Sequence, residues 1–147
     1  MDVAALITWI LTAGGGFFLL ATWIRNGGAR SQSGGNSHFP PALIFGHFAL
    51  AAIGLIVWII YVVSDTRALA WTAFGLLVPV ALLGLAMFVR WIPTYRARQA
   101  VPVGGSSAPS DTGPAERHFP VVVVGAHGVL AVVTVVLVLL AALKIGS

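Results

Sequence analysis

Four histidines are the residues of this 147-residue chain whose type and spacing could carry chemistry. They form two pairs with the same internal spacing, because His47 follows His38 by nine residues and His127 follows His118 by nine. A neutral imidazole can ligate haem iron, copper or zinc, and it can exchange a proton near neutral pH. The sequence has no cysteine, so thiolate-bound clusters, cysteine-bound zinc and a haem attached through a CxxCH motif are excluded.

The inner pair, His47 and His127, lies about seven residues, or roughly 10 Å, inside long apolar segments. Apart from these two, the uncharged segments contain no ionisable side chain except Tyr61. An ionisable group within a membrane is costly and marks a functional site by default. His47 and His127 are therefore candidate cofactor or metal ligands. The alternative is a neutral histidine that hydrogen-bonds between helices.

The outer pair, His38 and His118, stands at the start of the same apolar segments. Each begins a His-Phe-Pro sequence, and proline is favoured in the first turn of a helix. A partly hydrated histidine at a helix entrance is one interpretation. A ligand or proton carrier is the other, and both histidines are kept as cofactor-binding candidates.

The composition indicates a membrane protein. Hydrophobic residues make up 59% of the chain and charged residues 8%, against roughly 25% charged residues in a typical soluble domain. A soluble enzyme and a disordered chain are thereby excluded. The net charge of +4 comes from basic residues scattered among apolar segments, which form no stripe for nucleic acid. The expected partner is the lipid bilayer.

Four segments without charge are long enough to cross a bilayer, which needs ~20 residues. They are residues 3–24, 41–63, 68–89 and 119–143. Backbone polar groups in lipid must be satisfied internally, so each segment is expected to be a helix. The sequence thus predicts an all-α, four-transmembrane-helix bundle, with longer loops at 25–40 and 91–117. Gly and Ser predominate in residues 104–110, which predicts a flexible stretch.

The distribution of basic residues predicts the orientation. Six arginines lie in or beside the two long loops, whereas the opposite side holds only Arg67 and Lys144. The positive-inside rule then places loops 25–40 and 91–117 in the cytoplasm and both termini on the non-cytoplasmic side. We expect a multi-pass protein of a bacterial-type cytoplasmic membrane.

The sequence also contains an internal repeat. Residues 20–25 (LATWIR) and 85–90 (LAMFVR) close the first and third segments, and the His-Phe-Pro sequences open the second and fourth. The separations are 65 residues for the first pair of motifs and 80 for the second. This pattern indicates a parallel duplication of a two-helix unit, residues 1–64 and 65–147. His47 and His127 are then expected at one depth.

Small and aromatic residues surround the candidate site. Gly46 precedes His47, and Gly125 and Gly128 flank His127, so either a flat ring or a neighbouring helix could approach there. Residues 14–16 (GGG) and Pro79, near the middle of their segments, are interpreted as close-packing and kink sites. Trp9 and Trp58 lie deeper than an interfacial belt requires, and are expected to face a partner or the bundle interior.

Four spans with two histidines on each of two like-oriented helices resemble the plan of bis-histidine membrane b-type cytochromes. The resemblance covers the two histidine helices and implies haem b held between the second and fourth helices, in an electron-transfer or quinone-facing subunit. Those two-haem cytochromes space their histidines about thirteen or fourteen residues apart, close to four turns. Nine residues instead place His38 and His47 on opposite faces. A single haem on His47 and His127 is therefore implied, with His38 and His118 near its propionates or in the loops. The His-Phe-Pro entrance also resembles families of small multi-span membrane proteins, without an activity attached.

Two other functions stay open. One is a cofactor-free accessory subunit of a larger membrane complex. The other is copper or zinc binding by the four imidazoles, with His47 and His127 as the candidate metal ligands, although no carboxylate or thiolate is expected near the histidines as a supporting group. No nucleophile–base pair or phosphate-binding motif occurs. The chain is expected to be at most the electron-transfer subunit of an oxidoreductase.

Overall fold

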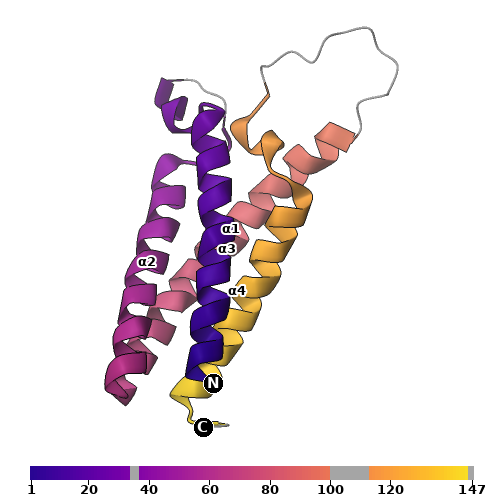
Figure 1. Ribbon diagram of the computed structural model, residues 1–147. Coiled ribbons are helices and arrows are strands. Elements are labelled where there is room, and N and C mark those ends of the chain that lie inside the picture. The colour runs from indigo at the N-terminus through magenta and orange to yellow at the C-terminus, as the bar shows by residue number, and fades with distance from the viewer. Residues whose placement is uncertain (34–36, 100–112, 146–147) are drawn as a thin grey trace, which may run out of the picture.

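The computed structural model describes residues 1–33, 37–99 and 113–145. Four α-helices account for most of them: α1 (Asp2–Arg25), α2 (Pro41–Ser64), α3 (Arg67–Gln99) and α4 (Val121–Ala142). Two short 3₁₀ helices, η1 (Gly28–Ser33) and η2 (Ala115–His118), precede α2 and α4 (Figure 1). Each α-helix is long and apolar enough to cross a membrane. The predicted all-α class with four candidate spans is confirmed.

Helix boundaries follow the local sequence. Proline occupies the first position of α2 at Pro41 and immediately precedes α4 at Pro120, where its fixed φ suits the start of a helix. α2 ends at Ser64 because the next residue, Asp65, adopts the left-handed conformation with φ of 50°. Thr66 alone then separates Asp65 from the start of α3.

One boundary differs from the prediction. The third span was expected to end at residue 89, but α3 continues through Pro93 to Gln99. Part of the predicted loop 91–117 is therefore helical. The reason is packing, because Trp91 is buried in a cluster with Trp23 and Phe119 from other segments, and its ring also stacks on Tyr95 one turn later, with centroids 5.0 Å apart. The predicted flexible stretch 104–110 lies outside the described residues.

The four helices form a bundle of two closely packed pairs. α2 packs most extensively on α3, and α1 packs most extensively on α4. Contacts between these pairs, α1 with α2 and α3 with α4, are less extensive. α2 and α4 therefore lie diagonally across the bundle. Figure 1 places the start of α1 and the end of α4 at one end of the bundle, and the end of α1 and the start of α4 at the other.

Large side chains fill the bundle at the end where the termini lie. Trp58 is fully buried and Trp9 nearly so, with ring centroids 6.3 Å apart, and Trp58 Nε1 donates to the Asp2 carbonyl at 3.3 Å. Both tryptophans face the bundle interior, one of the two predicted placements. Gly54 makes room for Trp9, because an added Cβ there would lie 3.0 Å from the indole. Five small residues belong to the same buried cluster, namely Ala5, Ala70, Ala73, Ala141 and Ala142.

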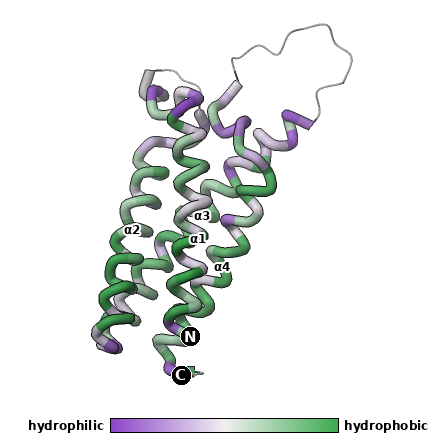
Figure 2. The backbone as a smooth tube through the Cα atoms, in the orientation of Figure 1, coloured by the Kyte–Doolittle hydropathy of each residue, from purple (hydrophilic) through white to green (hydrophobic). Residues whose placement is uncertain are grey.

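The outer surface of the helices is apolar over most of their length. Figure 2 shows hydrophobic residues along the helices, with hydrophilic residues gathered at the helix ends. Large aliphatic side chains point outward, including Val63 at 84% and Val122 at 81% exposure. A monomer in water rarely presents such a continuous apolar surface. In a bilayer it is the surface expected to contact lipid.

A second buried cluster lies at the loop end of the bundle. Trp23, Phe39, Trp91 and Phe119 form its centre. Trp23 is fully buried and lies directly on Gly28, where an added Cβ would collide with the indole. This packing fixes the chain segments that lead into α2 and α4, and with them the outer histidines.

Candidate functional site

The inner histidines meet inside the bundle. The ring centroids of His47 on α2 and His127 on α4 lie 6.4 Å apart, and the ring planes are inclined at 60°. Both side chains are largely removed from the surface. Residues 80 positions apart in the sequence are thus brought together across the diagonal of the bundle, as a shared ligand would require.

Each inner ring is anchored by one hydrogen bond to a neighbouring helix. His47 Nδ1 lies 3.0 Å from the Val80 carbonyl oxygen of α3, and His127 Nδ1 lies 2.9 Å from the Thr12 carbonyl oxygen of α1. A carbonyl oxygen only accepts, so each Nδ1 is the protonated donor. In the neutral ring Nε2 then keeps its lone pair and is the atom available to a ligand.

A glycine on the same neighbouring helix allows each ring to approach. A Cβ added at Gly16 of α1 would lie 3.0 Å from His127 Cε1. A Cβ added at Gly84 of α3 would lie 3.3 Å from His47 Cε1. Both distances are tighter than ordinary van der Waals contact. A larger residue at either position would push the imidazole away from its carbonyl acceptor.

The two histidines therefore share one local arrangement. In both cases the glycine stands four residues after the carbonyl acceptor, at Thr12 and Gly16 in α1 and at Val80 and Gly84 in α3. The separation between corresponding residues is 68, three more than the separation of 65 between the motifs that close these helices. This difference is close to one helical turn, so an alignment on the closing motifs pairs Gly16 with Ala81 rather than with Gly84.

The glycines beside the histidines in the sequence have another environment. A Cβ added at Gly46, Gly125 or Gly128 would meet nothing within 4 Å. No neighbouring helix in the described part of the chain packs against these glycines, so the expectation of close helix packing there is wrong, whereas the approach of a flat cofactor ring stays a prediction. Successive side chains of a helix point in different directions, so the contacts of each histidine ring come from the adjacent helices. The predicted close-packing site at residues 14–16 is confirmed at Gly15 and Gly16, which contact His127.

A buried carboxylate holds one outer histidine at the loop end. Glu116 of η2 is fully buried, and its Oε1 lies 2.9 Å from His38 Nδ1 and accepts the His38 backbone N–H at 2.7 Å. The Ser37 hydroxyl donates to Glu116 Oε2 at 2.8 Å and accepts from Trp23 Nε1 at 2.9 Å. Because every polar group in this network has a partner, the burial of the carboxylate is compensated.

This network corrects the expectation that no carboxylate lies near the histidines. Glu116 stands two residues before His118, but its partner is His38 in the other half of the sequence. The position two residues before His38 is Asn36. Comparison of the two His-Phe-Pro motifs therefore gave no signal for Glu116. The sequence feature that could have indicated Glu116 is its position just outside the apolar segment 119–143.

The outer histidines are not equivalent to each other. His118 Nδ1 lies 3.3 Å from the Ala115 carbonyl within its own 3₁₀ turn, whereas His38 Nδ1 also lies 3.4 Å from the Thr94 hydroxyl of α3. Both residues are exposed. In the described part of the chain no ring contact joins either of them to the inner pair. The inner pair alone forms a two-histidine site.

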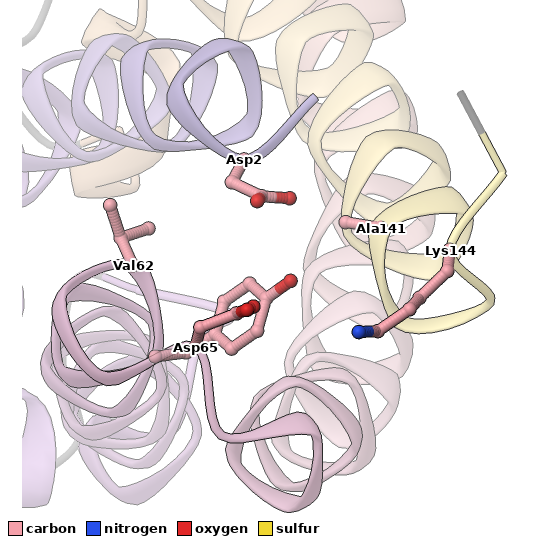
Figure 3. Close-up of a pocket in the computed structure, with 6 residues that line it drawn as sticks. Asp2, Val62, Asp65, Ala141 and Lys144 are labelled. Atoms are coloured by element: carbon pink, nitrogen blue, oxygen red, sulfur yellow. The ribbon is translucent and has the colours of Figure 1, made fainter. Parts of the chain in front are cut away.

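A separate polar cavity of about 310 Å³ lies at the opposite end of the bundle. Figure 3 shows the Asp2 and Asp65 carboxylates turned into it, with the Lys144 ammonium group approaching from the other side. Tyr61, Val62 and Ala141 complete its lining. Two carboxylates and one ammonium group face the same space, so the lining of this cavity carries a net negative charge.

The arrangement thus offers two imidazoles, oriented by carbonyls and facing one another in an apolar bundle. Within residues 1–33, 37–99 and 113–145, no group of three or more histidine or acidic side chains is placed to hold a metal ion. Comparison with protein-family models, curated proteins and solved structures gave no match for this chain.

Proposed function

We propose that this chain is an integral membrane electron-transfer protein that binds one b-type haem between α2 and α4, where His47 and His127 would hold it. The observation that carries the proposal is the 6.4 Å separation of the two ring centroids. Two imidazoles that held one metal ion between them, each through a nitrogen ~2 Å from the ion, would have centroids about 6 Å apart.

The surrounding residues fit this group. Both Nδ1 atoms donate to main-chain carbonyls, at Val80 and Thr12. This is the usual supporting bond of a metal-ligating histidine, which fixes the ring and raises the basicity of the ligating nitrogen. The two histidines also belong to different helix pairs, and contacts between the pairs are the less extensive ones. A planar cofactor between facing helices is a common device of helical bundles.

The chemistry supplied by such a haem is the gain and loss of one electron at iron. The contribution of the chain is to orient both ligands, through Thr12 and Val80, and to surround them with apolar helices that exclude water. Axial ligation, hydrogen bonding to the ligands and burial are the properties by which a protein tunes a haem potential. The fitting partners are a membrane quinone or another membrane subunit.

The proposal includes the placement in the cell. Six arginines beside loops 25–40 and 91–117 support a cytoplasmic location for these loops, with both termini on the other side of a bacterial-type cytoplasmic membrane. A duplicated two-helix unit, residues 1–64 and 65–147, is supported by the matching surroundings of His47 and His127. In each case the ring is anchored on the first helix of the other unit.

A cofactor-free accessory subunit is the second candidate function. It is favoured by the same hydrogen bonds, because a histidine that donates to a neighbouring helix already acts as a polar contact between helices. Copper or zinc is the weaker alternative. Two imidazoles fall short of the three or four protein ligands of a typical zinc site. Elemental analysis of the purified protein separates the metals from iron.

Histidine variants test the ligand assignment. We expect His47→Ala and His127→Ala each to abolish the absorption of a bound b-haem, whereas His118→Ala, which removes an exposed imidazole, keeps it. All three proteins are compared at equal concentration after purification in the same detergent. Equal haem content in the three variants would refute the ligand assignment. A colourless wild-type protein that contains no iron would favour the accessory subunit.

A further inference from the structure

A basic groove lies at the loop end of the bundle, away from the inner histidines. Its volume is about 770 Å³. Three arginines line it, Arg90 and Arg98 from α3 and Arg117 from η2, together with His38. The groove exists because α3 extends beyond its predicted end and stands beside the segment that leads into α4.

One wall of the groove is a single face of α3. Arg90, Thr94, Ala97 and Arg98 line it at spacings of three, four and eight residues, and such spacings place side chains on one side of a helix. Pro93 lies on the same face and, with Ala97, adds apolar surface between the two arginines. The face therefore presents two positive charges separated by an apolar strip.

The arginines are held by main-chain carbonyls. Arg90 Nη1 donates to the His38 carbonyl at 3.3 Å, and Arg98 Nη1 donates to the Arg117 carbonyl at 3.2 Å. The side chain of Arg117 lies directly on Gly113, where an added Cβ would collide with it. Each guanidinium has five N–H donors. Most donors of Arg90 and Arg98 thus stay available to a ligand while the side chains are fixed in place.

These charges have no acidic partner in the part of the chain that the structure describes. The salt bridge found there joins His38 to Glu116, and no carboxylate lies within ion-pair distance of Arg90, Arg98 or Arg117. Glu116 is fully buried and bound to Ser37 and His38. Three guanidinium groups thus converge on one groove that carries a net positive charge.

We propose that this groove binds a phosphate-bearing anion at the cytoplasmic boundary of the membrane. Guanidinium groups match phosphate oxygens in charge and in paired hydrogen-bond geometry. Basic pockets between transmembrane helices on the cytoplasmic side are suited to anionic lipid headgroups. The apolar strip of Pro93 and Ala97 would accept the start of an acyl chain. The shared chemistry is the phosphate, whether it belongs to a phospholipid or to a soluble phosphate.

The test compares two triple variants of the full chain in detergent. Arg90→Gln/Arg98→Gln/Arg117→Gln removes the groove charges. Arg25→Gln/Arg30→Gln/Arg96→Gln removes the same total charge from arginines that do not line the groove. Binding of phosphatidylglycerol, phosphatidylcholine and inorganic phosphate is measured by native mass spectrometry and titration. At roughly fivefold per arginine, the groove variant should bind phosphatidylglycerol on the order of 100-fold more weakly.

A second variant pair keeps every charge. Ala97→Trp fills the groove, whereas Ala86→Trp places the same side chain on an exposed position of α3 within the membrane span. We expect only Ala97→Trp to weaken phosphatidylglycerol binding. If the triple variant does not fold, this pair still tests whether phosphatidylglycerol binding depends on the groove.

The outcomes separate the sources of phosphate. Preference for phosphatidylglycerol over phosphatidylcholine, lost in the groove variants alone, supports a lipid headgroup site. Binding of inorganic phosphate that displaces phosphatidylglycerol and depends on the same arginines supports a soluble phosphate. Equal losses in both triple variants, or no binding of either probe by the unaltered chain, would overturn the proposal.

Discussion

The imidazoles of His47 and His127 lie next to each other across the diagonal of the bundle, with ring centroids 6.4 Å apart and ring planes inclined at 60°. Each is tied by Nδ1 to the helix that packs against its own, His47 to α3 and His127 to α1. The ring positions are thus set by two helix pairs that contact each other less extensively than the helices within each pair. Nδ1 anchors each ring, so these hydrogen bonds leave Nε2, the nitrogen that would bind a metal, unused.

The first prediction concerns the glycines beneath the rings. Gly16→Val should displace His127, because even a Cβ would lie 3.0 Å from Cε1, and overpacking of this kind costs about 1–3 kcal/mol. Gly14→Val is the matched control, since a Cβ there meets nothing within 4 Å. Thermal unfolding followed by tryptophan fluorescence should show a lower Tm for Gly16→Val alone. Equal Tm values would contradict the close packing on His127.

The second prediction concerns the buried carboxylate. Glu116→Ala leaves the His38 N–H and the Ser37 hydroxyl without their acceptor and removes the ion-pair partner of the His38 ring. Loss of such bonds to a buried charged group should lower the unfolding free energy by about 2–4 kcal/mol. Glu116→Gln keeps an acceptor oxygen and should cost less. If chemical denaturation gives the same stability for both variants and the unaltered protein, the network contributes nothing.

The third prediction concerns the tryptophans at the terminal end. Trp58→Ala removes a fully buried indole that packs on Trp9, and should destabilise the bundle by about 3–5 kcal/mol. Trp71, which is 40% exposed, is the control, and Trp71→Ala should change stability far less. Similar losses for the two variants in thermal unfolding would show that burial of Trp58 is not what stabilises this end.

The fourth prediction tests orientation in the membrane. Because the chain has no cysteine, a single introduced cysteine is the only thiol. Thr66→Cys, between α2 and α3, should react with a membrane-impermeant maleimide on intact cells. Gln99→Cys, at the end of α3, should react only after the cells are permeabilised. The reverse pattern would place the long loops outside the cytoplasm and contradict the positive-inside assignment.

The sequence predicted the fold class well because the bilayer allows few structures. Segments of twenty or more uncharged residues must be helices in lipid, and the expected spans match α1, α2 and α4 to within two residues at each end. The end of α3 was not predictable from hydropathy. Trp91 is buried in a cluster with Trp23 and Phe119 from other segments, and packing with distant residues leaves no trace in local composition.

The candidate site was predictable in its ligands but not in its surroundings. His47 and His127 stood out because ionisable residues are rare within a span. The residues that hold them, Thr12 and Val80, contribute only main-chain carbonyls, which any residue possesses. Glu116 escaped notice for a related reason, since its pairing with His38 depends on how two distant loop segments fold together.

The most direct test of the haem proposal is the reduced-minus-oxidised absorption spectrum of the purified protein, with haem content determined on the same sample. A single site between His47 and His127 predicts the spectrum of a six-coordinate b-type haem at about one haem per chain. Two haems per chain would contradict the assignment of one ligand pair. Protein purified from cells with ample haem that shows no such absorption, and that takes up none when haem is added, would contradict the proposed function.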